Sequence, residues 1–218
     1  MWDPHGAHAE YAIAPSITTF PLPPNISFEE GSTIPLAAMT AALAIYQNLG
    51  APLPWQPIPK GPSFPILIYG GASAVGAFAL KLAKLSGLSP IITVAGNGIP
   101  FVESLKAADT IIDYRKEDVP SAIKSALGSL KLFHAFDAIC GNNSWKHILA
   151  VLSRDGQQPK LNIVDPPTGV TPWPPIEGEG VKFSRTFVSS AYGKPHSMRN
   201  AEEAAQDRDF AFVMYRLV

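Results

Sequence analysis

Residues 66–76 read ILIYGGASAVG, a short apolar run that leads directly into a glycine-rich turn. Four consecutive apolar residues, 66–69, predict a strand that is covered on both faces, as in a parallel sheet. Gly70 and Gly71 permit a sharp turn, and Gly76 permits close packing of the next element on the strand. The stretch therefore predicts a buried strand, a tight turn and a helix in direct succession.

The helix is expected in residues 75–87, VGAFALKLAKLSG. Its apolar face would consist of Val75, Phe78, Ala79, Leu82 and Leu85. Lys81 and Lys84 would point away from that face, and Gly87 is typical of the position that follows a helix. The unpaired amides and the dipole at the start of such a helix favour a bound phosphate group.

The turn is an imperfect match to the glycine fingerprint of dinucleotide-binding proteins. If Gly71 and Gly76 are its first and last glycines, Ser73 occupies the middle position. A serine there narrows the approach of a pyrophosphate, although its hydroxyl could donate a hydrogen bond to it. An ordinary tight turn between strand and helix is the alternative.

The rest of the chain alternates short apolar runs with helical segments. Further strands are expected at Ile91–Val94, Ile111–Asp113, Ala135–Cys140, Leu161–Val164 and Lys182–Val188, and further helices at Phe101–Ala108, Ser121–Leu127 and Trp145–Leu152. Strands separated by helices predict a doubly wound parallel sheet, because parallel neighbours need crossover connections. A glycine turn after the first strand of such a sheet favours a dinucleotide site.

The end of the second strand bears on which dinucleotide is bound. NAD-binding proteins usually place Asp or Glu there to hold the ribose hydroxyls, but this strand ends Val94-Ala95-Gly96-Asn97. Without a carboxylate nothing repels a 2′-phosphate, so NADPH is favoured over NADH. Residues 114–116, Tyr-Arg-Lys, follow the third strand and could approach the phosphate, or form an ordinary solvated loop.

Composition excludes several classes of protein. The 218 residues carry a formal net charge of −1, so nothing predicts binding to nucleic acid or to an anionic membrane. No apolar stretch is long enough to span a bilayer, and we expect a soluble, cytoplasmic protein. Cys140 is the single cysteine, which excludes an internal disulfide and a cysteine-rich zinc site.

Residues that could carry out catalysis are not recognisable from spacing. No Ser/His/Asp or Cys/His arrangement stands out, and no set of metal ligands does, which argues against a hydrolase and a zinc-dependent alcohol dehydrogenase. Cys140, at the end of the fourth expected strand, would lie near a bound nicotinamide, although a buried small residue is the alternative.

Four segments resemble medium-chain dehydrogenase/reductases of the zinc-independent, quinone-reductase-like branch. They are GAHAEY (6–11), PLAAMTAALAIYQNLG (35–50), YGGASAVGAFALKLAK (69–84) and the pair Ala108-Asp109 with Asp113-Tyr114-Arg115. The serine-containing turn is most similar to fungal trans-acting enoyl reductases of secondary metabolism, which partner polyketide synthases. The resemblance implies an NADPH-dependent oxidoreductase that reduces an α,β-unsaturated thioester or ketone, either free or bound to a carrier. Its alternatives are a quinone reductase and a non-catalytic nucleotide-binding fragment.

The resemblance also implies positions for the cofactor. The residues expected to contact NADPH are Thr40, Gly71, Ser73, Ala74, Val75, Gly76, Asn97, Tyr114, Cys140, Ile163, Val164 and Asp165. Of these, Thr40 and residues 163–165 would border the nicotinamide, 73–75 the pyrophosphate, and Asn97 and Tyr114 the adenosine ribose with its 2′-phosphate. Ala107 stands where a glycine normally ends a helix in the family, so a left-handed residue is expected there.

Relative to that family the sequence is short at both ends. Residues 1–34 would be the remnant of a GroES-like β domain, expected as a separate β fragment, and 35–218 the Rossmann domain without its returning C-terminal segment. In the terminal helical segment, Phe210, Val213, Met214 and Leu217 form an expected apolar stripe. The resemblance assigns no catalytic residue, no metal and no oligomeric state.

Overall fold

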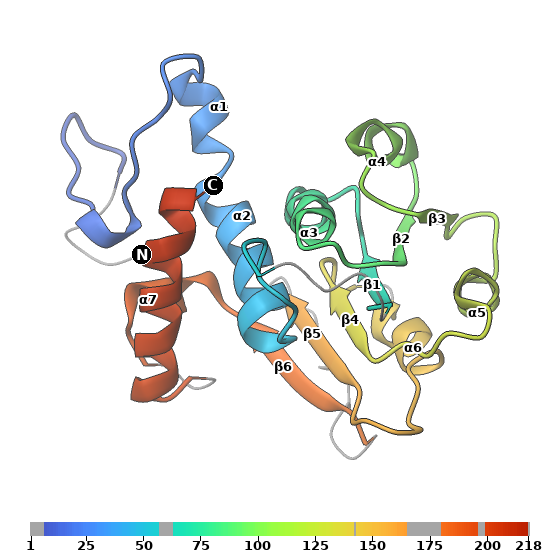
Figure 1. Ribbon diagram of the computed structural model, residues 1–218. Helices are drawn as coiled ribbons and strands as arrows, with labels where there is room; N and C mark the ends of the chain where they lie inside the picture. The colour runs from blue at the N-terminus through green and yellow to red at the C-terminus, as the bar shows by residue number, and fades with distance from the viewer. Residues whose placement is uncertain (1–6, 57–62, 142, 165–179, 196–198, 218) are drawn as a thin grey trace. The chain divides into compact units, whose positions relative to one another are not determined.

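The computed structural model describes residues 7–56, 63–141, 143–164, 180–195 and 199–217 (Figure 1). The chain divides into two compact units: residues 40–187 form one, and residues 1–39 with 188–218 form the other. The cofactor motifs all belong to the first unit, which is built around a sheet.

Six parallel strands make that sheet. They are β1 (Ile66–Tyr69), β2 (Ile91–Ala95), β3 (Thr110–Asp113), β4 (His134–Asp137), β5 (Lys160–Val164) and β6 (Lys182–Thr186). Their order is β3-β2-β1-β4-β5-β6, and every neighbouring pair is parallel. The expected doubly wound Rossmann sheet is therefore confirmed, with the glycine turn at the carboxyl end of a central strand.

Two strands end earlier than the sequence predicted. β4 stops at Asp137 and not at Cys140, because the Asp137 carboxylate accepts the amides of Ile139 and Cys140 at 3.1 and 2.9 Å and turns the chain away. β6 stops at Thr186, and a 3₁₀ helix begins at Val188. In both cases a local turn replaces the last expected strand residues.

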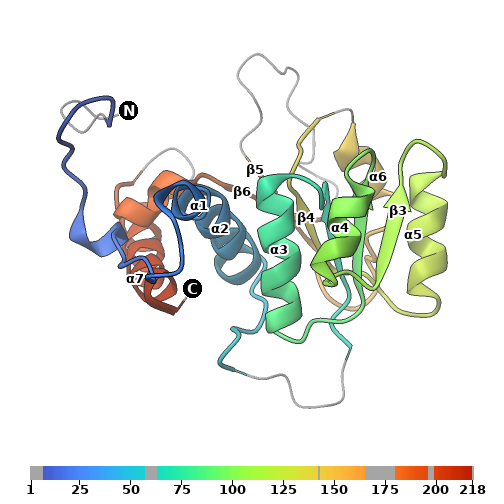
Figure 2. The ribbon, with the colours of Figure 1, turned by 90° about the horizontal axis from the view of Figure 1, so that it is seen from above.

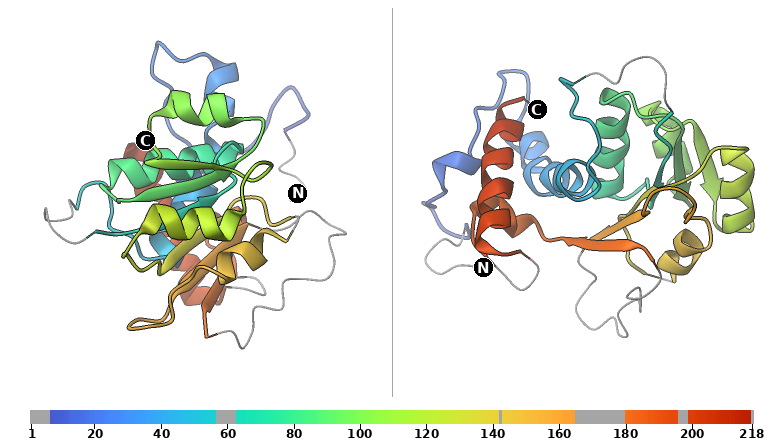
Figure 3. Two further views of the ribbon diagram at one scale, coloured as in Figure 1. Left: turned by 90° about the vertical axis from the view of Figure 1, so that its right-hand side faces the viewer. Right: turned by 60° about the horizontal axis from the view of Figure 1, so that its bottom comes forward.

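Helices cover both faces of the sheet. α3 (Ala74–Leu85) and α4 (Ile99–Leu105) lie side by side on one face, and α5 (Val119–Leu127) and α6 (Ser144–Leu149) lie on the other (Figures 2 and 3). α2 (Pro35–Ala42) continues as a π-helix, Leu43–Asn48, which packs on β5 and β6. Its Tyr46 hydroxyl lies 2.8 Å from Ser86 Oγ after α3.

The apolar face of α3 matches the expected one at Ala79 and Leu82 and differs from it elsewhere. Its buried residues are Gly76, Ala77, Ala79, Leu80, Leu82 and Ala83. Leu85 is 68% exposed, and Val75 and Phe78 are only half-buried, so the buried face combines the small residues with Leu80 and Leu82. Gly87 follows the helix with φ +71°, as expected for a left-handed residue at that position. At the end of α4 the left-handed residue is Lys106, with φ 52°, and not Ala107.

The second unit is helical in its described part. It contains a 3₁₀ helix (Ser16–Thr18), α1 (Phe28–Ser32), a second 3₁₀ helix (Val188–Tyr192) and α7 (Ala201–Leu217). Residues 7–34 hold no strand, so the β fragment expected in 1–34 is not formed by the residues described there. A lone strand is not stable without paired neighbours, and among these residues none is available. The domain boundary at residue 34 stays a prediction.

Of the expected stripe, helix α7 buries Met214 but not Phe210 or Val213. The buried positions are Ala204, Asp207, Ala211 and Met214, whereas Val213 is 43% exposed. Asp207 is tolerated inside because Arg199 Nη2 donates to its Oδ1 at 3.0 Å. Phe20 stacks on Tyr215 at 5.6 Å between ring centroids, and the Tyr215 hydroxyl donates to the Pro35 carbonyl at 3.2 Å.

Candidate functional site

A cavity of about 450 Å³ opens at the carboxyl ends of β1, β2 and β4. β1 pairs with β2 on one side and with β4 on the other, so this is where the strand order reverses. Ligands of doubly wound sheets bind at such points. The lining residues are Tyr69, Gly70, Ala72, Ser73, Val94, Ala95, Gly96, Asn97, Gly98, Tyr114, Ile139 and Gly141. None of these described residues is acidic.

The glycines of the turn are required by close packing. Gly70 adopts φ +87°, a left-handed conformation that favours glycine. A Cβ on Gly76 would overlap the Gly70 carbonyl and lie 2.9 Å from its carbon. A Cβ on Gly71 would overlap the Thr93 hydroxyl, which itself donates to the Ile68 carbonyl at 2.7 Å. The turn can therefore follow β1 this closely only with glycine at these positions.

Ser73 is the N-cap of α3. Its Oγ accepts the amide of Gly76 at 3.0 Å, and its hydroxyl lies 3.5 Å from the Ala138 carbonyl. The amides of Gly70 and Gly71 both donate to the Val94 carbonyl, at 2.9 and 3.2 Å. The amides of Ala74 and Val75, at the first two positions of the helix, donate no backbone hydrogen bond to any described residue. These two N–H groups can therefore donate hydrogen bonds to an anion bound at the start of the helix.

The opposite wall of the cavity is formed where β2 and β3 end. Asn97 and Tyr114 line it, and the Tyr114 ring lies against Gly96. A Cβ on Gly96 would come within 2.6 Å of Tyr114 Cε1 and 2.8 Å of its hydroxyl oxygen. The missing side chain at Gly96 thus makes room for the aromatic ring beside the end of β2.

An arginine is fixed at the edge of this wall. Arg115 donates to Asp113 through Nε at 2.8 Å and Nη2 at 2.7 Å, while Nη1 donates to Asn97 Oδ1. The Arg115 guanidinium, helped by Lys116, holds the pKa of the Asp113 carboxyl well below its usual range. Asp113 is therefore a charged but paired carboxylate, and the side chain of Arg115 stays 39% exposed.

The loop after β4 is organised by a buried carboxylate. Asp137, fully buried, accepts from the amides of Ile139 and Cys140 and from the Ser144 hydroxyl. Burial raises the pKa of Asp137, and these three donors oppose that rise. Cys140 adopts φ 48° within this loop and is itself buried. The arrangement presents Ile139 and Gly141 to the cavity.

Tyr69, the last residue of β1, contributes a phenol to the cavity. Its hydroxyl lies 3.1 Å from His147 Nδ1 on α6. Burial, with the nearby Asp137 charge, raises the pKa of Tyr69 to about 12. The phenol therefore stays protonated at neutral pH and can act only as a neutral hydrogen-bonding group.

The structure brings some of the sequence-predicted residues together. Ser73, Asn97 and Tyr114 line the cavity, and Gly71, Ala74, Val75 and Gly76 form the adjoining turn. Thr40, Cys140 and Ile163 are buried and Val164 is half-buried, none of them lining it, and Asp165 lies outside the described residues. Sequence reasoning assigned no site role to Tyr69, although it lies within the glycine-turn motif, or to Ile139, which no motif marks. The sequence does place a carboxylate, Asp113, two residues before a guanidinium, Arg115, and this spacing could have predicted the ion pair.

No three His, Cys, Asp or Glu side chains gather as metal ligands in the described ranges. Among the helices described, none combines the length and the apolar character needed to cross a membrane.

Comparison with known sequences finds relatives that carry the same name, trans-enoyl reductase. No family model matches the chain. It is 38% identical over 194 residues to the trans-enoyl reductase fsr4 of Gibberella fujikuroi, covering 87% of this chain and 56% of that protein. It is 36% identical to the trans-enoyl reductase fsa3 of a Fusarium species, covering 69% of this chain and 42% of the relative. The chain thus spans about half the length of the curated relatives it matches.

Solved structures share the fold. Escherichia coli quinone oxidoreductase complexed with NADPH superposes with a TM-score of 0.64 at 20% identity, over 88% of this chain and 55% of that one. The CurK enoyl reductase gives a TM-score of 0.64 at 18% identity, over 88% and 54%.

Proposed function

The chain belongs to the medium-chain dehydrogenase/reductase superfamily, and it is similar to fungal trans-enoyl reductases over about half of their length. We propose that it is the cofactor-binding part of an NADPH-dependent reductase. Its substrate would be an α,β-unsaturated thioester or ketone. The observation that carries the proposal is the cavity at the strand reversal, with a free helix N-terminus on one wall and Asn97, Tyr114 and Arg115 on or beside the other.

The turn fits a pyrophosphate. The unpaired amides of Ala74 and Val75 and the positive end of the 12-residue helix α3 would face its negative charge. Ser73 would act mainly by capping the helix, since its oxygen already accepts the Gly76 amide. Gly71 and Gly76 would hold the turn in shape and not contact the cofactor through their amides, which are both used within the protein.

The other wall fits a 2′-phosphate. No described lining residue is acidic, and Asp113 nearby is paired with Arg115. The Tyr114 hydroxyl could donate to the phosphate, and the partly exposed Arg115 supplies a positive charge close to Asn97. These features favour NADPH over NADH.

Bound NADPH would supply the hydride that reduces the double bond. The chain's own part would be to hold the cofactor and to line one side of the reaction space. Thr40, Cys140, Ile163, Val164 and Asp165 remain proposed neighbours of the nicotinamide. We assign no catalytic residue and no metal.

The cofactor proposal is tested by binding. Isothermal titration of the purified chain should give a lower Kd for NADPH than for NADH. Tyr114→Phe should weaken NADPH binding by roughly tenfold or more, because one hydrogen bond to a charged group, about 1.5–3 kcal/mol, is lost, and it should leave NADH binding unchanged. Equal affinity of the native chain for both nucleotides would contradict the argument from the missing carboxylate.

Turnover is a separate question. NADPH oxidation with a crotonyl thioester tests enoyl reduction, a quinone acceptor tests the alternative activity, and NADPH binding without either would identify a non-catalytic nucleotide-binding chain. Because the relatives are named trans-enoyl reductases, the substrate proposed for this chain is carrier-bound, with a polyketide synthase as the proposed partner. Comparing a free thioester with the same acyl group on a carrier protein would test that partner.

A further inference from the structure

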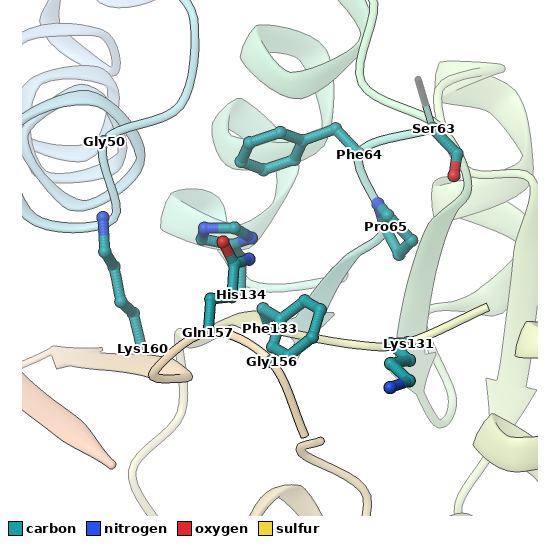
Figure 4. A pocket seen from close by; sticks show the side chains of 10 residues that line it. All are labelled: Gly50, Ser63, Phe64, Pro65, Lys131, Phe133, His134, Gly156, Gln157 and Lys160. Atoms are coloured by element: carbon teal, nitrogen blue, oxygen red, sulfur yellow. The ribbon is translucent and has the colours of Figure 1, made fainter. Parts of the chain in front are cut away.

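A second cavity, of about 680 Å³, lies at the opposite edge of the same sheet (Figure 4). It is formed where β1, β4 and β5 begin, whereas the cofactor cavity is formed where strands end. Strands of four and five residues separate the two, a span of about 13 Å or more at roughly 3.3 Å per residue. Its volume is in the range of small-molecule sites. We call it the amino-end pocket and define it by Phe64, Lys131, Phe133, His134, Gln157 and Lys160.

The charge of the amino-end pocket is positive. Lys131 and Lys160 line it, and no described lining residue is acidic. Lys160 Nζ donates to the Leu49 carbonyl at 2.8 Å, which uses one of the three N–H groups of an ammonium. Lys131 Nζ donates to the Asp155 carbonyl at 3.3 Å and lies 4.0 Å from the carboxylate of the same residue, whose side chain is 87% exposed, so the ion pair neutralises little of its charge.

The middle of the pocket is aromatic. The Phe64 and His134 rings stack with centroids 4.2 Å apart and an interplanar angle of 22°. In the view of Figure 4, these rings and Phe133 lie between Lys160 and Lys131, and the Gln157 amide lies beside His134. Burial lowers the pKa of His134 to about 4, so the imidazole is neutral at pH 7 and offers a planar polar surface.

Flat rings of Phe64, Phe133 and His134 between two lysine side chains match a particular ligand chemistry. A planar ring would extend the Phe64–His134 stack, and an anionic substituent would meet two lysines that each use only part of their N–H groups within the protein. We propose that the amino-end pocket is a second small-molecule site, which takes a planar aromatic ring bearing a carboxylate or a phosphate group. The proposal is independent of the reductase function, because no residue of the cofactor cavity takes part.

The experiment uses fluorine NMR on the full chain. The probes are 4-fluorobenzoate, 4-fluorophenyl phosphate and the neutral 4-fluorobenzamide. At least one anionic probe should show saturable line broadening, with the amide binding roughly tenfold more weakly, as expected for loss of a charge-assisted contact. The two anions distinguish a carboxylate ligand from a phosphate ligand. Equal binding of the neutral amide, or no broadening by either anion, would overturn the proposal.

Variants locate the binding. Lys160→Gln and Lys131→Gln should each weaken the anion by roughly threefold or more, the range of a partly exposed charge contact. Lys124→Gln, an exposed lysine on α5 outside the pocket, is the matched control and should bind as the native chain does. Phe64→Ala should weaken the ring contact. Thermal melts confirm that each variant is folded, and Lys131 is exposed enough for its variant to fold.

Saturating NADPH separates the two cavities. If the anion occupies the amino-end pocket, its affinity should not change when NADPH is present. Displacement of the anion by NADPH would place it in the cofactor cavity and would reject the second site, as would unchanged affinity in both lysine variants.

Discussion

Gly76 packs directly against the carbonyl of Gly70, so that the first turn of helix α3 contacts the backbone of the first residue after β1. A Cβ at Gly76 would overlap the Gly70 oxygen and lie 3.0 Å from Gly71 Cα. Backbone atoms cannot move aside as the end of a side chain can. The closeness of strand and helix, and with it the direction of the helix N-terminus, depends on this contact.

Gly76→Ala should therefore destabilise the chain and weaken NADPH. We expect the free energy of unfolding to fall by about 2 kcal/mol or more, as for overpacked interiors, measured by urea unfolding. Gly141→Ala is the control for stability alone, because a Cβ there would meet Ile139 at an ordinary 3.7 Å but Gly141 lines the cofactor cavity. Native stability in the Gly76 variant would show that the turn adapts.

Substitutions at Ser73 distinguish a role in capping helix α3 from a direct contact with the cofactor. Its Oγ accepts the Gly76 amide at 3.0 Å, so Ser73→Ala should cost about 1 kcal/mol of stability, whereas glycine at an N-cap costs only a few tenths. If Ser73 acts mainly as a cap, Ser73→Gly should bind NADPH with nearly native affinity in a titration. A large loss of NADPH affinity in a fully stable Ser73→Gly variant would instead assign the hydroxyl a direct contact.

The parts of the fold that follow from local chemistry were predictable. The run 66–69, its glycines and the amphipathic segment after them determine a strand, a turn and a helix, and crossover helices require parallel strands. The predictions that were wrong concern which side chains are buried, and this depends on how elements distant in the sequence pack together. Leu85 is exposed although it continues the apolar spacing of Ala79 and Leu82, and Leu80, which was not expected on that face, is fully buried.

The same distinction applies to the sites. Ser73, Asn97 and Tyr114 could be expected in one cavity because each follows or adjoins the end of a strand near the reversal. Arg115 donates hydrogen bonds to both Asp113 and Asn97. Asn97 follows a different strand from Arg115, so the order of residues in the sequence does not reveal this contact. The amino-end pocket is assembled from segments far apart in the chain, and no motif marks it.

His134 should make stability depend on pH. Burial, with the charge of Lys160, lowers its pKa from 6.5 to about 4, so between these values the unfolded chain binds a proton that the folded chain does not. The free energy of unfolding should fall as the pH falls through that range. At about pH 5 the loss from this group is about 2 kcal/mol.

Urea unfolding at pH 7 and at about pH 5 measures this contribution. Other acidic groups titrate in the same range, so the comparison is with His134→Phe, which keeps a ring for the stack with Phe64. The native chain should lose more stability than the variant on acidification. Equal losses in the two proteins would mean that His134 is not buried as described.

The cofactor preference should be reversible at Gly96. An aspartate there would place a carboxylate at the end of β2, where it could accept from ribose hydroxyls and would repel a 2′-phosphate. Gly96→Asp should therefore bind NADH more tightly than NADPH, measured as the ratio of the two Kd values. The substitution has a second effect, because a Cβ would come 2.6 Å from Tyr114 Cε1 and push the ring aside.

Gly96→Ala separates charge from displacement of the ring. The alanine variant moves Tyr114 without adding a carboxylate, so it should lose part of its affinity for NADPH but gain none for NADH. If the alanine and aspartate variants show the same ratio of Kd values, the preference depends on the position of Tyr114 and not on the missing acid. If only aspartate inverts the ratio, the uncharged end of β2 is what admits the 2′-phosphate, with Arg115 beside it as the nearest fixed cation.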